Sequence, residues 1–306
     1  MIEISADKNF DRLDVFLVEK LDITRSNAQK LIKSGLVDGA DGKRLRASTT
    51  VLEGQNFIVE IPVSPNSEAL EAEDIDFDVI YSDEHLMIIN KPARLVVHPA
   101  PGNWHGTLVN GLVYRFPEMR KLTNRMRPGI VHRLDSGTSG LMVVAKTQNA
   151  CVILQKMFLK RTVKKKYLAL THNSPERHEG ILSGPLERDP DNFMKMAIIE
   201  GGKPSLTGYK VLWSMNNFSL IECNLFTGRT HQIRAHMAAL GCPLIGDNIY
   251  GKPSEVFNGR IYLHSWKLEF THPITKIDMA FRLNVPEDFI EKISEIKAIN
   301  SYKFSE

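Results

Sequence analysis

The sequence predicts an α+β protein with a mixed, mainly antiparallel sheet, preceded by a small separate unit. From about residue 76 onward, short strand-like segments recur and only a few helical segments lie between them. About the first sixty residues instead combine two helical patterns with turn-rich strands. A segment rich in Pro, Ser, Asn and acidic residues separates the two stretches and has little periodicity. These three observations predict two domains joined by a linker.

Composition narrows the class of protein before any motif is considered. The chain has 306 residues with 42% hydrophobic and 25% charged residues, which is ordinary for a globular protein of this length. Its net charge of +3 permits a polyanionic partner but does not demand one. The three cysteines, Cys151, Cys223 and Cys242, lie far apart, which argues against a disulfide framework and against a zinc knuckle. With no signal-peptide pattern and no membrane-length apolar run, we expect a cytoplasmic protein with no membrane partner.

The N-terminal unit begins with helical spacing and continues with strands. Phe10, Leu13, Leu17 and Leu21 recur as on one helix face, and Thr24 or Ser26 can cap a second helix that Gly35 ends. The following residues read as short strands joined by Asp-Gly turns. Basic residues accompany these elements, among them Arg12, Arg25, Lys30 and Lys33. They are either a solvated surface or a phosphate-binding face.

Two segments of this unit carry a resemblance to a known domain. The stretches "DRLDVFLVEKL" and "TRSNAQKLIKSGLV", with the turn-rich "DGKRL" after them, resemble an S4 RNA-binding domain. The resemblance implies a helical face that grips structured RNA. We therefore expect a small α/β S4-like RNA-binding domain over residues 1–62, a linker over 63–75 and a catalytic domain over 76–306.

The second domain reads as strands with interspersed helices. Strands are predicted within 77–92, 129–135, 140–147, 163–172, 217–228 and 259–286. Helices are predicted over 149–160, over 229–241 with Gly241 at its end, and after Pro286. No glycine-rich phosphate-binding motif follows a strand, so a mononucleotide cofactor is not expected.

One carboxylate, Asp135, lies in an apolar context and raises a chemical question. It follows the apolar "GIVHRL" and precedes the turn residues "SGTSG". A carboxylate in such a place needs a partner, and a structural role in the turn is the simplest interpretation. A nucleophile elbow fails because position 141 is leucine rather than glycine. A metal site is not expected either, because His231 and His236 are five residues apart and do not face one side of a helix.

Two basic segments suggest an RNA-facing groove. In "VKKKYLAL", strand alternation places Lys165 and Tyr167 on one face, where lysine can meet phosphate and tyrosine can stack on a base. The segment "TGRTHQIRAH" adds Arg229 and Arg234, either of which could pair with a buried carboxylate. Each basic run by itself is more typical of a solvated face.

Five separated blocks together resemble the RluA family of pseudouridine synthases, and within it the RluD type. They are "INKPARLVVHPAPGNWHGTLVNGLVYRFP", "RPGIVHRLDSGTSGLMVVAKT", "VKKKYLAL", "LFTGRTHQIRAHMAALGCPLIGDNIYG" and "LHSWKLEFTHPITK". The resemblance implies a mainly antiparallel sheet bent around a central cleft. It also implies that uridine in RNA becomes pseudouridine by base flipping, without metal or cofactor.

The resemblance assigns roles to individual residues. Asp135 is implied to be the essential carboxylate and Arg133 to fill the space that the flipped base vacates. Tyr167 is implied to stack on that base. Arg229 is expected to pair with Asp135, with Arg234 as the second choice, and Leu263 to shape the base pocket. One departure is clear: the family usually has Lys-Asp directly after the catalytic acid, where this chain has Ser136 and Gly137.

The expected substrate is large-subunit (23S) ribosomal RNA or its precursor, and the expected oligomeric state is a monomer. Two alternatives remain open at this point. The same chemistry could act on tRNA, or the chain could be a non-catalytic RNA-binding factor in ribosome assembly. The joint presence of Asp135, Tyr167 and Arg229 argues against the second alternative.

Overall fold

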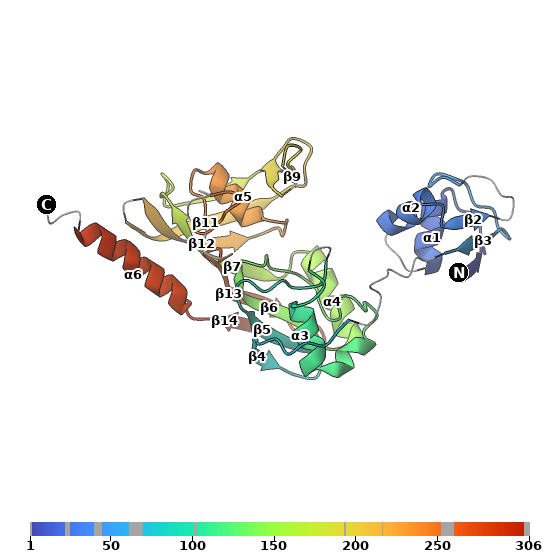
Figure 1. Cartoon of the computed structure of the whole chain (residues 1–306), viewed down its shortest axis with the longest axis horizontal. Helices are drawn as coiled ribbons and strands as arrows, with labels where there is room; N and C mark the ends of the chain where they lie inside the picture. The colour runs from blue at the N-terminus through green and yellow to red at the C-terminus, as the bar shows by residue number, and fades with distance from the viewer. Residues whose placement is uncertain are drawn as a thin grey trace. The chain divides into compact units, whose positions relative to one another are not determined.

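A computed structural model describes residues 2–21, 25–39, 45–60, 70–100, 103–192, 194–215, 217–251 and 260–302. The chain divides into two compact units, Met1–Ala69 and Leu70–Glu306 (Figure 1). Each unit has a hydrophobic core of its own.

The N-terminal unit packs two helices on a three-stranded antiparallel sheet. Its elements are β1 (Ile2–Ser5), α1 (Leu13–Leu21), α2 (Arg25–Lys33), β2 (Val37–Gly39) and β3 (Asn56–Val59), with strand order β1-β3-β2. Phe16 and Leu17 of α1 are fully buried in its core. Gly35 has a φ of +70°, as expected of a residue that follows a helix. The two predicted helices are confirmed, but Phe10 precedes α1 and bridges to Val51, and Ser26 lies inside α2 rather than at its cap. Thr24 and residues 40–44 lie outside the described residues, and the S4 resemblance stays a prediction.

The predicted linker over 63–75 is too long at its C-terminal end. Residues 61–69 lie outside the described part of the chain, but residues 70–75 pack on the second unit. Leu70 is buried against Val109 and Val113. The Leu70 carbonyl accepts a hydrogen bond from Arg120 at 2.7 Å, and the Glu73 carboxylate accepts one from the Gly106 N–H at 3.0 Å. The composition of this stretch did not predict these contacts. They involve backbone carbonyls, which every residue has, and one carboxylate of an acidic segment.

A nine-stranded sheet forms the frame of the second unit. Its order is β4-β5-β6-β13-β7-β12-β11-β8, with β14 paired to β13. All of its strand pairs are antiparallel except the parallel pair of β13 with β6, which confirms the predicted mixed sheet. The strands are β4 (Asp78–Ser82), β5 (Leu86–Lys91), β6 (Ser139–Ala145), β7 (Lys164–His172), β8 (Glu179–Ser183), β11 (Leu206–Met215), β12 (Phe218–Leu225), β13 (Leu263–Thr271) and β14 (Asp278–Arg282). A separate two-stranded sheet joins β9 (Leu186–Arg188) to β10 (Met196–Ile198).

The helices of this unit lie against the sheet and beyond its ends. They are α3 (Leu108–Arg115), the 3-10 helix η1 (Pro117–Lys121), α4 (Gln148–Leu159), α5 (Gln232–Ala239) and α6 (Glu287–Tyr302). The N-cap hydroxyl of Thr147 accepts the Ala150 N–H, which starts α4 directly after β6. In Figure 1, α3 and α4 lie beside β4–β6, and α5 lies beside β11. Among the helices of the described residues, none combines the length and apolar character needed to cross a bilayer.

The predicted strand over residues 129–135 is wrong. Gly129 has a φ of +73°, and the only backbone ladder contact of this stretch is the bridge from Ile130 to Val144. The Val143 N–H, which a neighbouring strand would normally pair, donates instead to the imidazole Nε2 of His132 at 3.1 Å. The His132 side chain therefore pairs with β6 where a neighbouring strand would lie. The segment leading to Asp135 is an ordered loop.

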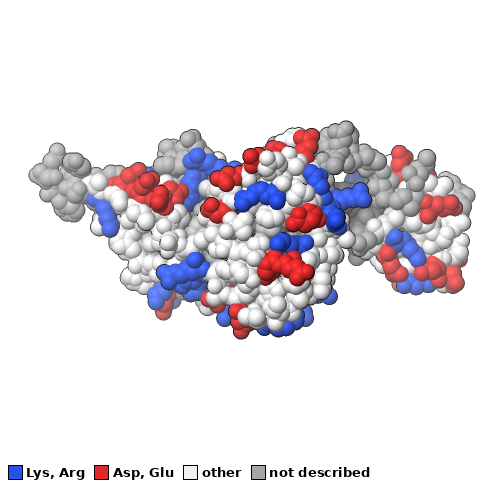
Figure 2. All heavy atoms as spheres, turned by 90° about the horizontal axis from the view of Figure 1, so that it is seen from below, with Lys and Arg blue, Asp and Glu red and all other residues white. Residues whose placement is uncertain are grey.

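Charges of both signs are interspersed on one face of the molecule. On the face drawn in Figure 2, Lys and Arg occur in small groups between Asp and Glu.

Candidate active site

A cavity of about 510 Å³ opens beside the loop that carries Asp135. Its walls come from residues 131–138, α4, β7, the end of β12, the segment 225–231 and the start of α5. Five lining residues are Lys or Arg and one is a carboxylate, namely Arg133, Arg161, Lys165, Arg229, Arg234 and Asp135. A pocket of this volume and charge can hold a nucleotide with its phosphates.

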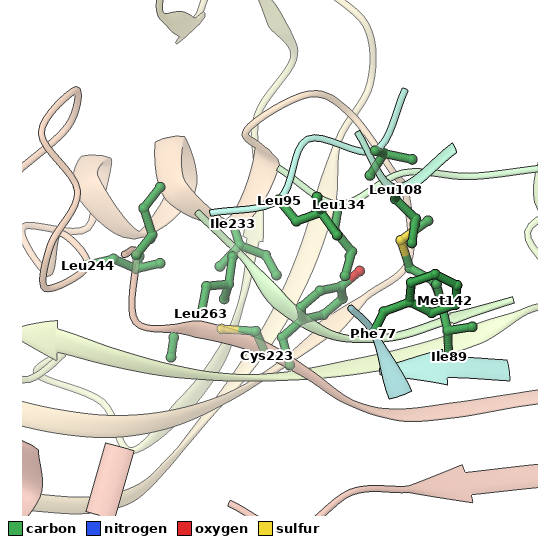
Figure 3. Close-up of a cluster of buried hydrophobic side chains, with 14 of the residues drawn as sticks. Phe77, Ile89, Leu95, Leu108, Leu134, Met142, Cys223, Ile233, Leu244 and Leu263 are labelled. Atoms are coloured by element: carbon green, nitrogen blue, oxygen red, sulfur yellow. The ribbon is translucent and has the colours of Figure 1, made fainter. Parts of the chain in front are cut away.

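The floor of the cavity is apolar and continuous with the core. Leu134, Ile233 and Leu263 are buried in one cluster with Cys223 (Figure 3). These three leucine and isoleucine side chains also line the cavity. Leu263 thus lines the cavity from its apolar side, and its role in a base pocket stays a prediction.

Asp135 ends a chain of three charged side chains. Its Oδ2 accepts a hydrogen bond from Nη1 of Arg234 at 3.0 Å. The other side of the same guanidinium is held by Asp247, with Nε to Oδ2 at 2.7 Å and Nη2 to Oδ1 at 2.9 Å. The side chains of Asp247 and Arg234 are 0% and 4% exposed, whereas Asp135 is 18% exposed. Of the two carboxylates, only Asp135 therefore reaches the cavity.

The electrostatics of this chain keep Arg234 charged. Burial alone would lower its pKa, but the hydrogen bond and charge of Asp247, together with Asp135, raise the pKa of Arg234 above its usual value. Arg234 therefore presents a permanent cation 3.0 Å from Asp135. A partly exposed carboxylate in an apolar-floored pocket can act as a nucleophile or as a base.

The predicted pairing of Arg229 with Asp135 is wrong. Arg229 lies in the segment before α5, and its Nε donates to the carbonyl of Pro204 at 3.4 Å. It lines the mouth of the cavity rather than contacting the acid. Arg234, the second choice, makes the contact because it lies on the buried face of α5, between Asp135 and Asp247.

Gln232 and His231 organise the segment before α5. The Gln232 amide oxygen accepts from the Thr227 hydroxyl at 2.7 Å and from the Arg229 N–H at 3.0 Å. Gln232 is 3% exposed, so it shapes the loop and is not open to a base edge. His231 has a left-handed backbone with φ of 54°, and its Nε2 lies 3.9 Å from Oδ2 of Asp135. Sequence reasoning missed the proximity of His231, since it depends on this single unusual φ.

Tyr167 and Lys165 share one face of β7, as predicted. Both line the cavity, whereas Lys164 and Lys166 form ion pairs with Glu269 and Glu222. Burial raises the pKa of Tyr167, and the charge of Asp135 raises it further against the opposing contact of Ser265. Tyr167 is therefore a neutral phenol at physiological pH. Burial lowers the pKa of Lys165 to about 8.

Arg133 is exposed and lines the cavity directly before the Asp135 loop. Its neighbour His132 anchors the loop by stacking on Phe158, with ring centroids 4.4 Å apart. Burial lowers the pKa of His132 to about 3, so its Nε2 is free to accept the Val143 N–H. The anchor leaves Arg133 pointing away from the core.

Of the four basic residues predicted for RNA binding in the N-terminal unit, the structure describes the side chains of two. Arg12 is engaged in a two-pronged pair with Asp14, with contacts of 2.9 and 3.0 Å. Lys33 is exposed. The side chains of Arg25 and Lys30 lie outside the described residues.

The structure shows no clustered metal ligands within its described residues. His236 hydrogen-bonds Thr207 at 3.0 Å, while His231 faces Tyr250 at 3.3 Å, so the two imidazoles have separate partners.

Comparison with known proteins adds an independent line of evidence. Residues 85–239 match the family described as RNA pseudouridylate synthase. The chain is 38% identical over 298 residues to the uncharacterized RNA pseudouridine synthase YlyB of Bacillus subtilis, covering 97% of each chain. It is also 38% identical over 307 residues to ribosomal large subunit pseudouridine synthase D of Nitrosomonas europaea, covering 97% of this chain and 88% of the relative.

The fold is also found in solved structures. Human RNA pseudouridylate synthase domain containing 4 is similar with a TM-score of 0.57 and 24% identity, covering 72% of this chain and 92% of that chain. At this identity the likeness concerns the fold alone.

Proposed function

Because this chain belongs to the RNA pseudouridylate synthase family, we propose that Asp135 is the carboxylate through which it converts uridine to pseudouridine. One observation carries the assignment: Asp135 is the only Asp or Glu among the described residues that line the 510 Å³ cavity. Its contact with Arg234 at 3.0 Å holds the carboxylate in place there. The reaction breaks a bond between base and sugar and rejoins the same two parts, which requires a nucleophile or base at the sugar or the ring.

The remaining cavity residues support the movement and binding of the base. In this proposal the target uridine leaves its helix and rests on the apolar floor near Leu263, with Tyr167 beside it. Arg133, exposed at the mouth, takes the place that the base vacates. Lys165, Arg229 and Arg161 bind phosphates of the flanking strand. Lys33 and its basic neighbours in the S4-like unit would add a second RNA contact.

We propose large-subunit ribosomal RNA as the substrate. The support is that several relatives 38–40% identical over most of the chain are named ribosomal large subunit pseudouridine synthase D. The product contains the same atoms as the substrate, so the chemistry needs no redox partner or energy source. We further propose that the protein acts as a monomer in the cytoplasm.

Asp135→Asn tests the central assignment. This isosteric change removes the negative charge but keeps the shape, so pseudouridine formation should be abolished while RNA binding persists. Tritium release from RNA labelled at uridine C5 measures the reaction, and filter binding measures the affinity. Full activity of Asp135→Asn would refute the assignment.

A map of pseudouridine in cells with and without the protein identifies the substrate. Loss of sites in 23S ribosomal RNA alone is the expected result. Loss confined to tRNA would replace the ribosomal target with the tRNA alternative. An unchanged map, together with no tritium release by the pure protein, would favour the non-catalytic assembly factor.

A further inference from the structure

The turn after Asp135 is held through its backbone and not through its side chains. The Thr138 N–H donates to the Asp135 carbonyl at 3.1 Å, which closes a four-residue turn. The Ser136 side chain is exposed, and Gly137 has none. Two buried cations from other parts of the sequence instead donate to the carbonyls of Ser136 and Gly137.

Lys91, the last residue of β5, is the first of these cations. Its side chain is fully buried, and its Nζ donates to the carbonyls of Pro92 at 2.7 Å, Leu95 at 2.8 Å and Ser136 at 3.2 Å. An ammonium group has three N–H donors, so these three acceptors use all of them. Within the described part of the chain, Lys91 forms no ion pair with a carboxylate. Burial makes a charged lysine costly, and with the nearby charge of Arg260 it lowers the pKa of Lys91 to about 7.

Arg260, just before β13, is the second cation. It is 4% exposed, and its Nη1 donates to the carbonyls of Gly137 at 3.3 Å and Ile261 at 2.9 Å. The Ile261 N–H also donates to the Gly137 carbonyl, at 3.1 Å. The opposite edge of the guanidinium is fixed by Asp288 in the first turn of α6, with Nε to Oδ2 at 2.6 Å. The C-terminal helix therefore sets the direction in which Arg260 presents its donors.

We propose that Lys91 and Arg260 are positioning residues that fix Asp135 in the cavity by holding the carbonyls of Ser136 and Gly137. Arg234 holds the carboxylate of Asp135, and Lys91 and Arg260 hold the two main-chain carbonyls that follow it. Both restraints are needed, because a side-chain ion pair alone leaves the backbone of the turn free to shift. The inference rests on the proposed catalytic role of Asp135.

This arrangement explains the departure at positions 136 and 137. The family resemblance leads to the expectation of Lys-Asp after the acid, and this chain has Ser-Gly. Because the clamp uses only main-chain carbonyls, the side chains at these positions do not take part in it. The change to Ser136 and Gly137 therefore leaves the position of Asp135 intact.

Kinetics of Arg260→Met and Lys91→Met test the proposal on an RNA that the wild-type protein modifies. Displacing a catalytic group by about 1 Å can cost about 100-fold in rate, so kcat should fall about 10- to 100-fold. The KM for RNA should stay within about twofold, since the RNA-facing side chains are untouched. Arg260→Lys, which keeps the charge and can reach one carbonyl, should recover part of the loss. Arg282→Met, at an exposed arginine of β14, is the control for the loss of a positive charge.

Failure of this inference can be distinguished from failure of the proposed function. Wild-type kcat in folded Arg260→Met and Lys91→Met, with Asp135→Asn inactive, would overturn the inference alone. A raised KM with unchanged kcat would overturn it as well, because it would place these residues in RNA binding. Activity of Asp135→Asn would instead remove the premise.

A milder variant keeps the test decisive if the methionine variants do not fold. Asp288→Asn leaves Arg260 in place but weakens the contact that orients it, and should lower kcat about three- to tenfold. Glu295→Gln removes a carboxylate of the same helix that pairs with Lys292 at the surface, and should leave kcat unchanged. Equal kcat for the two variants would overturn the proposal.

Discussion

Arg234 and Arg229 lie five residues apart, yet they belong to two different environments. Arg234, on the buried face of α5, is 4% exposed and bonded to two carboxylates. Arg229, in the segment before that helix, lines the cavity, and its side chain donates to a backbone carbonyl without a carboxylate partner among the described residues. The same residue type thus serves two purposes: a buried, doubly paired arginine fixes the acid, and an open one is available to phosphate. The start of α5 at Gln232 separates the two.

The largest effect that this comparison predicts is that of Arg234→Gln. The change leaves Asp247 buried without its partner, which typically costs about 3–5 kcal/mol in the free energy of unfolding. It also removes the cation beside Asp135, and kcat should fall at least about 100-fold. Urea denaturation and tritium release measure the two effects. Loss of stability without loss of kcat in the folded fraction would contradict a role for Arg234 at the acid.

Asp247→Asn should have a smaller effect through the same chain. Asparagine keeps the shape and an acceptor for the N–H groups of Ile249 and Tyr250, but it loses the charge that holds Arg234. We expect a loss of about 1.5–3 kcal/mol in unfolding free energy and about a tenfold fall in kcat. An unchanged kcat would show that Asp135 alone orients Arg234. Asp189→Asn, at a half-buried aspartate whose carboxylate accepts the Asp191 N–H, is the matched control.

Features that depend on neighbouring residues could be predicted from the sequence, and features that depend on distant residues could not. The helices at α1, α4 and α5 and the strands at β5, β6 and β7 follow from spacing and caps within a few residues. The strand predicted over 129–135 fails because the imidazole of His132 takes the place of a strand at Val143. No local sequence pattern reveals that a side chain, and not a strand, accepts the Val143 N–H. Four residues predicted for the site line one cavity, namely Asp135, Tyr167, Lys165 and Leu263, and their roles stay predictions.

The partners of Asp135 illustrate what the sequence could not supply. Choosing between Arg229 and Arg234 required knowing that Arg234 is held from its other side by Asp247, thirteen residues farther along the chain. Lys91 and Arg260 are also distant from the Asp135 turn along the chain, and both donate to main-chain carbonyls. Carbonyls carry no residue identity, so no side-chain motif could have identified the contact.

Arg229→Gln should affect binding rather than chemistry. The side chain is partly exposed and has no carboxylate partner within the described residues, so unfolding free energy should change by less than about 0.5 kcal/mol. The KM for RNA should rise about fivefold with kcat unchanged. The slope of log affinity against log salt should become shallower by about one charge. A fall in kcat matching that of Arg234→Gln would remove the distinction between the two arginines.

Lys165 offers the smallest and most selective test of the open, phosphate-facing side of the cavity. Burial lowers its pKa to about 8, so the free protein loses this positive charge as the pH rises through 8. RNA binding favours the charged form and must then take up a proton, which weakens affinity at higher pH. Between pH 7 and about pH 8.3 the charged fraction falls about threefold, and the dissociation constant should rise by up to that factor.

A comparison of the wild type with Lys165→Arg isolates the titration of Lys165 from that of the other ionisable groups. Arginine stays charged over the whole range, so the variant should lose the part of the pH dependence that belongs to position 165. Lys91, whose pKa burial lowers to about 7, titrates in both proteins and cancels in the comparison. Identical pH profiles of RNA affinity for the wild type and Lys165→Arg would mean that Lys165 does not meet phosphate. The open side of the cavity would then depend on its arginines alone.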